Sequence, residues 1–451
     1  MFLGFRVHTN AIIDMAFSED DTRLATASGD QTARVVDMNT QTAITVLGKH
    51  NASLKQVRFQ PGANNNSVVA TTGRDGCVHI WDTRCAPEDG PVQELRGINA
   101  GMGNDPPWSR PIISIFDAHR QTFLKRTSLA MEGNDVPKHG ENSGRMGQVS
   151  VTCMSFLAQE NLLVTGSEKD ATIKLWDLRS LHRPQRGVVP TQYPVSETAY
   201  PESHSQWRHF GTTSISISGD GSRLYSLCKD NTVYAYSTAH LILGHAPELS
   251  QDDGAKRFPI KQTKEGLGPI CGYRHPKLFA TSFYVKSAIR KAEDGKSEML
   301  AVGSNDGCVV LFPTDDVYYP KHELGEEAIE RPPSPVPQAH AQPASSYFKG
   351  RPEESLPISS NGTALIRGHN KEVNSLSWTS EGNLISIADD FLVRVWRDDA
   401  GGEDAEDLRM GGEHSGRLWG CGWADVKGDF DDDEWTAPGE EAKWVPRLES
   451  L

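Results

Sequence analysis

The chain has 451 residues, of which 37% are hydrophobic and 24% charged, and its formal net charge is −14. It contains no run of about 18 apolar residues and no apolar signal segment in its first ten residues, which argues against a membrane span and against export. Its seven cysteines are scattered without CxxC spacing, which argues against a disulfide framework and a cysteine zinc site and fits a reducing compartment.

The negative charge is concentrated near the carboxy terminus. Residues 398–451 hold 16 acidic and 5 basic side chains, whereas the first 397 residues hold 44 acidic and 41 basic ones. No basic stripe of the kind that binds a phosphate backbone is present, so we expect no direct sequence-specific nucleic-acid binding. Residues 425–451 are expected to form an acidic, disordered tail.

One motif recurs along the chain: an apolar strand, a strand rich in Ser, Thr and Gly, and an Asp six residues before an aromatic residue or its equivalent. In chain order these pairs are Asp30 and Val36, Asp75 and Trp81, Asp170 and Trp176, Asp230 and Tyr236, Asp306 and Phe312, and Asp390 and Trp396. A His stands ahead of four copies, at His8, His50, His119 and His369. The pattern indicates WD repeats, units of about 40–45 residues that each form one four-stranded propeller blade.

The repeats predict an all-β fold, a WD-repeat β-propeller with six recognisable blades over residues 1–424. Insertions are expected at about 120–147, 181–206, 241–269 and 313–361, where the sequence turns polar or rich in Pro. We expect each His to hydrogen-bond the turn Asp of its blade and each Trp ring N–H to find a buried partner. The repeated His and Trp residues and their turn Asp partners, including Asp306, are therefore interpreted as scaffold rather than as a metal site or a catalytic triad.

Motifs of enzymes are absent from the sequence: it has no phosphate loop, no nucleophile elbow, no HExxH and no kinase set. We therefore expect no catalytic residue, no metal and no cofactor, and we interpret the protein as a binding module. An enzyme carried on a propeller is disfavoured.

Two adjacent copies end in the pattern WDxR, Trp81 to Arg84 and Trp176 to Arg179. Arg84 and Arg179 are expected to emerge where the third strands of their blades end. Guanidinium groups there can make bidentate contacts with carboxylates or carbonyls of a partner. The alternative is that each Arg pairs only with an acid on its own rim, and two consecutive copies favour the partner contact.

Several segments are similar to the denticleless-type WD-repeat substrate receptors of cullin-4 RING ubiquitin ligases. They are GDQTARVVD (29–37), GRDGCVHIWDTRC (73–85), IKLWDLR (173–179), RHFGTTSI (208–215), TSFYVKS (281–287) and GHNKEVNSLSW (368–378). The resemblance implies a nuclear, non-catalytic adaptor that presents degron proteins on the sliding clamp for replication-coupled ubiquitination and proteasomal degradation. Its partners would be the damaged-DNA-binding adaptor of the ligase and degron-bearing replication and cell-cycle proteins. A non-ligase WD scaffold, such as a chromatin- or histone-binding propeller, is the alternative.

The resemblance also assigns site residues. Arg84, Arg179, Asp82 and Asp177 carry over by position as contacts to the ligase adaptor. For the substrate we expect the opposite face, with candidates Arg208, His209, Tyr284, Lys286, Lys371 and Glu372. A basic residue beside an aromatic ring there can hold a peptide carbonyl or acid.

The number of blades is open at this point. The family ring is expected to have seven blades and a further amino-terminal segment, whereas six repeats are recognisable here. Either the sequence lacks one blade, or the ring has six blades and Phe2–Val7 or Arg417–Ala424 adds a closing strand. An unclosed ring would expose a strand edge.

Overall fold

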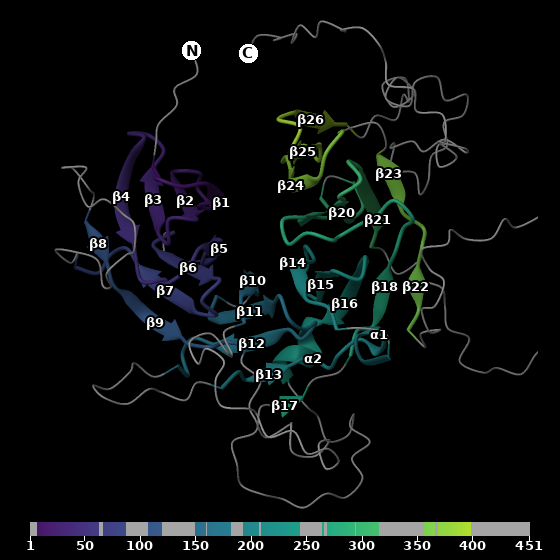
Figure 1. Cartoon of the computed structure of the whole chain (residues 1–451), viewed down its shortest axis with the longest axis horizontal. Helices are drawn as coiled ribbons and strands as arrows, with labels where there is room; N and C mark the ends of the chain where they lie inside the picture. Colours follow the sequence, from purple (N-terminus) through teal and green to yellow (C-terminus); the bar gives the residue numbers. More distant parts are fainter. Residues whose placement is uncertain are drawn as a thin grey trace, which may run out of the picture.

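The computed structural model describes residues 7–62, 66–86, 107–119, 149–158, 160–181, 193–206, 209–243, 264–265, 268–293, 295–314, 356–365 and 369–397. These residues form six sheets arranged around a common axis, with only two short helices (Figure 1). The predicted six-bladed, all-β WD-repeat propeller is therefore confirmed. The predicted insertion 120–147 and the predicted tail 425–451 lie outside the described residues.

Each sheet is one blade, and its strands follow in chain order from the inner strand outward. Blade 1 has β1 (Ile12–Phe17), β2 (Arg23–Ser28), β3 (Ala33–Asp37) and β4 (Thr42–Leu47), and blade 2 has β5 (Leu54–Phe59), β6 (Val68–Gly73), β7 (Val78–Asp82) and β9 (Pro111–Ile115). Blade 3 has β10 (Val151–Phe156), β11 (Leu162–Ser167), β12 (Lys174–Asp177) and β13 (Ser196–Glu197), and blade 4 has β14 (Thr212–Ile217), β15 (Arg223–Cys228), β16 (Thr232–Ser237) and β18 (Cys271–Tyr273). Blade 5 has β19 (Ser287–Arg290), β20 (Met299–Gly303), β21 (Val309–Pro313) and β23 (Thr363–Leu365), and blade 6 has β24 (Val373–Trp378), β25 (Leu384–Ala388) and β26 (Val393–Trp396).

Three two-residue strands extend the outer edges of blades 1, 3 and 4, each in parallel pairing: β8 (Trp108–Ser109), β17 (Lys264–Glu265) and β22 (Ile358–Ser359). The helices are α1 (Glu202–Gln206) and α2 (Thr238–Leu243), and α2 contacts β13 and β16. Neither of these described helices has the length and apolar character needed to cross a membrane.

The inner strands stand next to one another around the axis, with β1 beside β5 and then β10, β14, β19 and β24 in turn (Figure 1). The last of these, β24, and the first, β1, flank an opening of the ring in which no described strand lies (Figure 1). Blades 1 and 6 are therefore the two ends of an open series.

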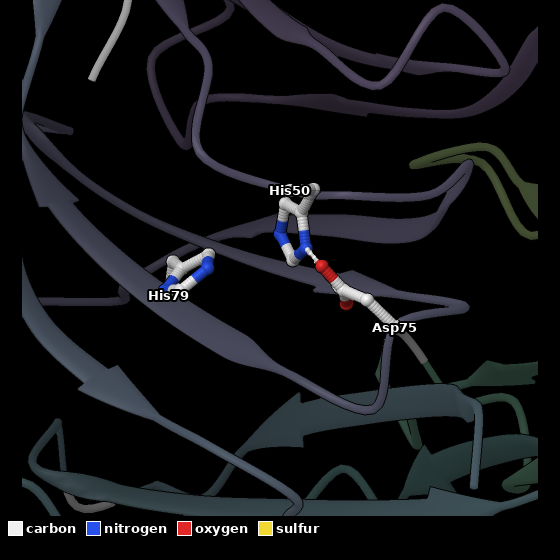
Figure 2. Close-up of side chains that lie close together, drawn as sticks. All are labelled: His50, Asp75 and His79. Carbon is white, nitrogen blue, oxygen red and sulfur yellow. Dashed lines mark hydrogen bonds and ion pairs between the residues drawn. The ribbon is translucent and has the colours of Figure 1, made fainter. Parts of the chain in front are cut away.

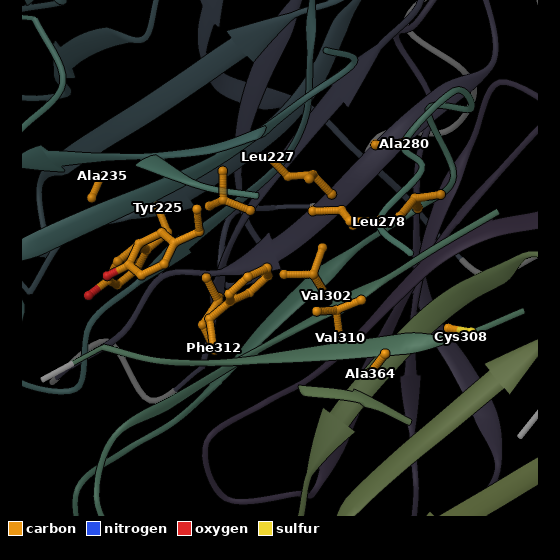
Figure 3. Close-up of a cluster of buried hydrophobic side chains, with 14 of the residues drawn as sticks. Tyr225, Leu227, Ala235, Leu278, Ala280, Val302, Cys308, Val310, Phe312 and Ala364 are labelled. Carbon is orange, nitrogen blue, oxygen red and sulfur yellow. The ribbon is translucent and has the colours of Figure 1, made fainter. Parts of the chain in front are cut away.

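The hydrophobic core is divided into layers, one between each pair of neighbouring blades. Figure 3 shows the layer between blades 4 and 5, where Tyr225, Leu227, Val302 and Phe312 meet and are fully buried. Because both faces of a blade are covered in this way, a middle strand such as β6 is buried at every residue. Stacking of blades, rather than any single blade, therefore holds the ring together.

Buried hydrogen bonds fix the turns of the blades that carry a His. In blade 2, His50 Nδ1 lies 3.0 Å from Asp75 Oδ2, and His50 Nε2 lies 2.9 Å from Thr71 Oγ1. The same Thr71 oxygen accepts a hydrogen bond from Trp81 Nε1 at 2.9 Å. Burial acts to raise the pKa of Asp75, but the hydrogen bond and charge of His50 leave it below its ordinary value. The expected scaffold role is thus confirmed for this blade.

The same set of contacts recurs in blade 6 through His369, Asp390, Ser386 and Trp396. Blade 1 keeps the bonds of His8 to Asp30 and Thr26 although Val36 replaces the Trp. In blade 3 the Trp176 and His119 rings both bond Thr165, while His119 Nδ1 lies 3.9 Å from Asp170.

Blades 4 and 5 depart from the pattern of the other four blades. Asp230 accepts a hydrogen bond from the Tyr234 hydroxyl at 2.6 Å instead. Asp306 is exposed, and Lys277 Nζ lies 4.0 Å from it. The interpretation of Asp306 as part of a His–Asp scaffold pair therefore does not hold.

The predicted insertion 181–206 is only partly a loop. Its residues 196–197 form β13, the outer strand of blade 3, and residues 202–206 form α1. A two-residue strand is too short to show a periodic pattern of its own, so it could not be predicted from the sequence.

Candidate functional site

The antiparallel order of strands gives the propeller two distinct faces. Turns from an outer strand to the next inner strand, and from second to third strands, lie on one face, which carries the His and Asp residues of the scaffold. Third strands end on the opposite face. We call these the top face and the bottom face, respectively. The described residues of the two predicted groups fall on different faces.

On the bottom face, Arg84 turns back onto the end of β7. Its Nε and Nη2 donate to the two carboxylate oxygens of Asp82 at 2.9 and 2.8 Å, and its backbone N–H donates to Asp82 Oδ1 at 3.0 Å. Arg179 makes the same three bonds to Asp177 at 3.0, 2.9 and 3.0 Å. The Arg side chains nevertheless stay 57% and 68% exposed. Two guanidinium groups with one common orientation are thus displayed by adjacent blades.

Each Asp of these pairs is an orienting group. The hydrogen bond from its Arg lowers the pKa of Asp82 and of Asp177, so both carboxylates remain ionised at neutral pH. In blade 1 the corresponding position is Asn39, whose backbone N–H also donates to Asp37 but which offers no guanidinium. Blades 1, 2 and 3 therefore share this turn, and among them blades 2 and 3 carry the Arg.

On the top face, two predicted residues lie together near the axis of the ring. Tyr284 is half-exposed, and the Lys55 ammonium lies 5.5 Å from the centre of its ring, although Lys55 belongs to β5 of blade 2. Lys229 approaches the ring of the adjacent Phe283 to 4.1 Å. Cationic and aromatic groups from blades 2, 4 and 5 thus converge here.

Lys286 extends from the same loop toward the ring axis. Its Nζ lies 3.3 Å from the Thr213 carbonyl oxygen and 3.4 Å from that of Phe283. Burial lowers the pKa of Lys286, while the charge of Asp14 opposes this effect. Asp14 is itself paired with Arg58 of β5. The axis is therefore lined by charged groups from blades 1, 2 and 5.

The remaining predicted substrate contacts are dispersed. His209 is exposed and packs edge-on against the His204 ring. Lys371 is exposed at the top turn of blade 6, and the neighbouring Glu372 accepts a hydrogen bond from Asn305 at 2.8 Å. Arg208 lies outside the described residues. The structure thus brings together Tyr284 and Lys286 from the predicted set.

Sequence reasoning missed Lys55, Arg58, Lys229 and Phe283 as members of this group. A signal for two of them was present, because Lys55 and Arg58 place two charged side chains on the inner strand β5, whose sequence is LKQVRF. A charged side chain on such a strand needs a polar partner or water, because burying an unpaired charge is costly. The contact of Lys55 with Tyr284 spans blades 2 and 5 and could not be read from one repeat.

The buried trio His50, Asp75 and His79 has the composition of a metal site, with its ligand atoms within 4.8 Å of one another (Figure 2). Both ring nitrogens of His50 are already hydrogen-bonded, to Asp75 and Thr71, and His79 Nδ1 lies 3.0 Å from Ser114 Oγ. These bonds belong to the blade scaffold, since blades 1 and 6 repeat the His–Asp pair. The trio is therefore interpreted as structural.

Comparison with known proteins agrees with the repeats. The family model "WD domain, G-beta repeat" matches residues 3–37, 41–82, 143–177 and 361–397. The chain is 29% identical over 412 residues to "Cell division cycle protein cdt2" of Schizosaccharomyces pombe, an alignment that covers 89% of this chain and 61% of that protein. It is 28% identical over 395 residues to "Denticleless protein homolog" of Danio rerio, covering 87% of this chain and 45% of the relative. The homologue of that name in Homo sapiens is 25% identical over 433 residues, covering 94% and 44%. The chain thus spans between about two fifths and three fifths of the length of these relatives.

Proposed function

We propose that this chain, which is a denticleless-type WD-repeat protein, is the substrate-recognition subunit of a cullin-4 RING ubiquitin ligase. It would present degron proteins carried on the sliding clamp for replication-coupled ubiquitination and degradation in the nucleus. The chain itself performs no bond chemistry in this role. It supplies proximity and orientation to a conjugating enzyme held by the RING subunit.

The observation that carries the proposal is the pair of matched guanidinium groups on the bottom face. Arg84 and Arg179 sit on adjacent blades, each oriented by an ionised Asp two residues earlier and each more than half exposed. A side chain held in one orientation before binding loses less conformational entropy when a partner arrives. We assign the damaged-DNA-binding adaptor of the ligase to this face, with Asp82 and Asp177 as orienting residues.

The top face is assigned to the substrate. Lys55, Lys229 and Lys286 stand among Tyr284 and Phe283 on this face. Such a surface can hold peptide carbonyls and acidic side chains by charge-assisted hydrogen bonds, while the rings contact apolar side chains. Because the top and bottom faces are opposite, adaptor and degron can bind at the same time.

The first test is retention of the adaptor by the full chain. The tagged protein is incubated with the purified cullin-4 adaptor and, separately, with histone peptides. Retention of the adaptor supports the proposal. Failure to retain it, together with binding of histone peptides, would replace the ligase role with that of a chromatin-binding scaffold.

A further inference from the structure

The residue directly before the turn Asp is positively charged in three consecutive blades. It is Arg74 in blade 2, Lys169 in blade 3 and Lys229 in blade 4, whereas blades 1, 5 and 6 carry Gly29, Asn305 and Asp389 at this place. The inner strands of blades 2, 3 and 4 are neighbours in the ring, so these three turns follow one another on the top face (Figure 1). Arg74 and Lys169 are exposed, and Lys229 is half-buried. Positive charge is therefore gathered on one sector of this face.

Two further lysines belong to the same sector. The Lys55 ammonium lies 5.5 Å from the centre of the Tyr284 ring. Lys286 Nζ donates to the carbonyl oxygens of Thr213 and Phe283. We call the five cations the basic arc; its members are Lys55, Arg74, Lys169, Lys229 and Lys286.

The basic arc holds more positive charge than its acidic neighbours balance. No acidic side chain in the described part of the chain forms an ion pair with Lys55, Arg74 or Lys169. Glu168 stands in this sector, and its carboxylate accepts a hydrogen bond from the Ser150 backbone N–H at 3.3 Å. Burial and the positive charge of Arg74 lower the pKa of Lys55, and the charge of Glu168 opposes them only in part. An anion bound here would relieve this repulsion.

Acidic side chains on the other side of the top face already have partners within the protein. Asp306 of blade 5 lies 4.0 Å from Lys277 Nζ. Asp389 of blade 6 accepts a hydrogen bond from the Asn374 side-chain amide at 2.6 Å. The top face is therefore uneven, with cations in excess over blades 2 to 4 and partnered acids in blades 5 and 6.

We propose that the basic arc binds an acidic segment of a protein ligand, whose carboxylate or phosphate groups lie over blades 2 to 4. This assignment rests on the proposed function, in which the top face holds the substrate, and it adds the chemical class of the element that is recognised. The planar guanidinium of Arg74 can bond two oxygens of one anion. Lys169 and Lys229 act as point charges on the following blades, so a segment with several acidic residues can contact all three turns.

A nucleic acid fits the basic arc less well than an acidic peptide. Single strands bind where bases stack on the open faces of aromatic rings beside cations. Here an ammonium group already faces each ring, Lys55 at Tyr284 and Lys229 at 4.1 Å from the centre of Phe283. A phosphate backbone that continued past blade 4 would also meet the exposed carboxylate of Asp306. The arrangement therefore favours a peptide.

Peptide binding to the full chain tests the proposal. Rhodamine-labelled peptides with one Gly/Ser framework carry three Asp, three Asn or three phosphoserine residues. Fluorescence anisotropy at low salt should show that the Asp peptide binds at least about tenfold more tightly than the Asn peptide. Tighter binding of the phosphoserine peptide alone would support the site and assign it to phosphate. Equal binding of all three peptides, or binding of none, would overturn the proposal, as would tighter binding of an oligothymidylate than of both anionic peptides.

A matched pair of variants locates the binding. Arg74→Gln with Lys169→Gln removes two charges from the basic arc and should weaken binding of the Asp peptide by about tenfold or more. Lys277→Gln with Lys291→Gln removes the same charge from residues outside the arc and should keep the wild-type affinity. Equal weakening by both variants would attribute the binding to net charge and contradict a site at these turns.

The adaptor assay separates failure of this inference from failure of the proposed function. Arg84 and Arg179 lie on the opposite face, so both charge variants should retain the adaptor. Wild-type protein that retains the adaptor but does not prefer anionic peptides would overturn the basic arc as a binding site and leave the ligase role standing. Wild-type protein that prefers the Asp peptide but does not retain the adaptor would overturn the ligase role alone.

Discussion

Arg84 donates from Nε and Nη2 to the two carboxylate oxygens of Asp82, only two residues earlier in the chain. An exposed ion pair of this kind contributes little to stability, because solvent screens it. Its consequence is orientation, since the guanidinium keeps one direction while more than half of its side chain remains exposed. Arg179 and Asp177 repeat the arrangement on the next blade.

The double variant Arg84→Ala with Arg179→Ala should lose adaptor binding. Truncation of an Arg at the centre of an interface typically costs about 2 kcal/mol of binding free energy. The affinity for the adaptor should therefore fall by well over tenfold. Biolayer interferometry with immobilised adaptor measures the change. Thermal unfolding should be unchanged, and Arg74→Ala, an exposed Arg on the top face, should bind like the wild type. Unchanged binding by the double variant would remove the role given to these two residues.

Replacing Arg by Lys at both positions separates charge from geometry. Lys keeps the positive charge but lacks the planar fork that bonds two oxygens at once. The variant Arg84→Lys with Arg179→Lys should therefore bind the adaptor more weakly than the wild type and more tightly than the Ala variant. Wild-type affinity in the same interferometry assay would show that charge alone suffices.

Substitutions on the top face should affect substrate and leave the adaptor bound. Tyr284→Ala with Lys55→Ala removes a cation–aromatic contact, and with it the exposed Tyr284 ring and the partly buried Lys55 ammonium. Fluorescence anisotropy with a labelled degron peptide should show at least tenfold weaker binding. Interferometry with the adaptor should give the wild-type value. Loss of both activities together would indicate misfolding rather than a binding site, and loss of neither would exclude this region as the substrate surface.

The buried bonds of blade 2 can be weighed against those of blade 1. Thr71→Val removes the hydrogen-bond partner of two ring nitrogens, those of His50 and Trp81. Thr26→Val removes the partner of one, that of His8. A buried polar group without a partner costs about 1–3 kcal/mol. Urea unfolding should therefore show a free-energy loss that is larger for Thr71→Val by about 1 kcal/mol or more. Equal losses would argue against a shared role of the Thr71 hydroxyl.

Acidification should destabilise the ring through its buried histidines. Burial lowers the pKa of His119 to about 3 from an ordinary value of 6.5, with the charge of Lys174 acting in the same direction. Between these values the unfolded chain binds a proton that the folded chain does not, so stability is lost as pH falls from about 6.5 toward 3.

The variant His119→Asn should flatten this dependence, by up to about 1.4 kcal/mol per pH unit. Urea unfolding between pH 4.5 and 7.5 measures the slope. Thr165→Val removes the hydrogen-bond partner but keeps the imidazole, so its slope should stay like that of the wild type. A wild-type slope in His119→Asn would assign the acid sensitivity to other groups.

Much of the fold could be predicted because it repeats. The six-residue spacing of Asp75 from Trp81, and of Asp390 from Trp396, locates the turn and the third strand of each blade. The same buried hydrogen bonds hold both turns. Departures from the repeat escaped prediction, such as the two-residue strand β13 and the exposed Asp306.

The candidate site was predictable only in part. Arg84 and Arg179 follow their strands directly, so local sequence locates them. The cations that contact Tyr284 and Phe283 come from blades 2 and 4, and such contacts depend on how the blades are arranged around the ring axis. Lys55, whose ammonium lies 5.5 Å from the centre of the Tyr284 ring, could therefore not be predicted from the sequence of one repeat.

Reconstituted ubiquitination tests the central claim most directly. The full chain is added to purified adaptor, cullin-4, RING subunit and conjugating enzyme with a degron protein bound to DNA-loaded sliding clamp. The account predicts that ubiquitin transfer requires the chain and falls to background with the Arg84→Ala and Arg179→Ala variant. Transfer that is equal with and without the wild-type chain, when the adaptor and substrate are otherwise active, would contradict it.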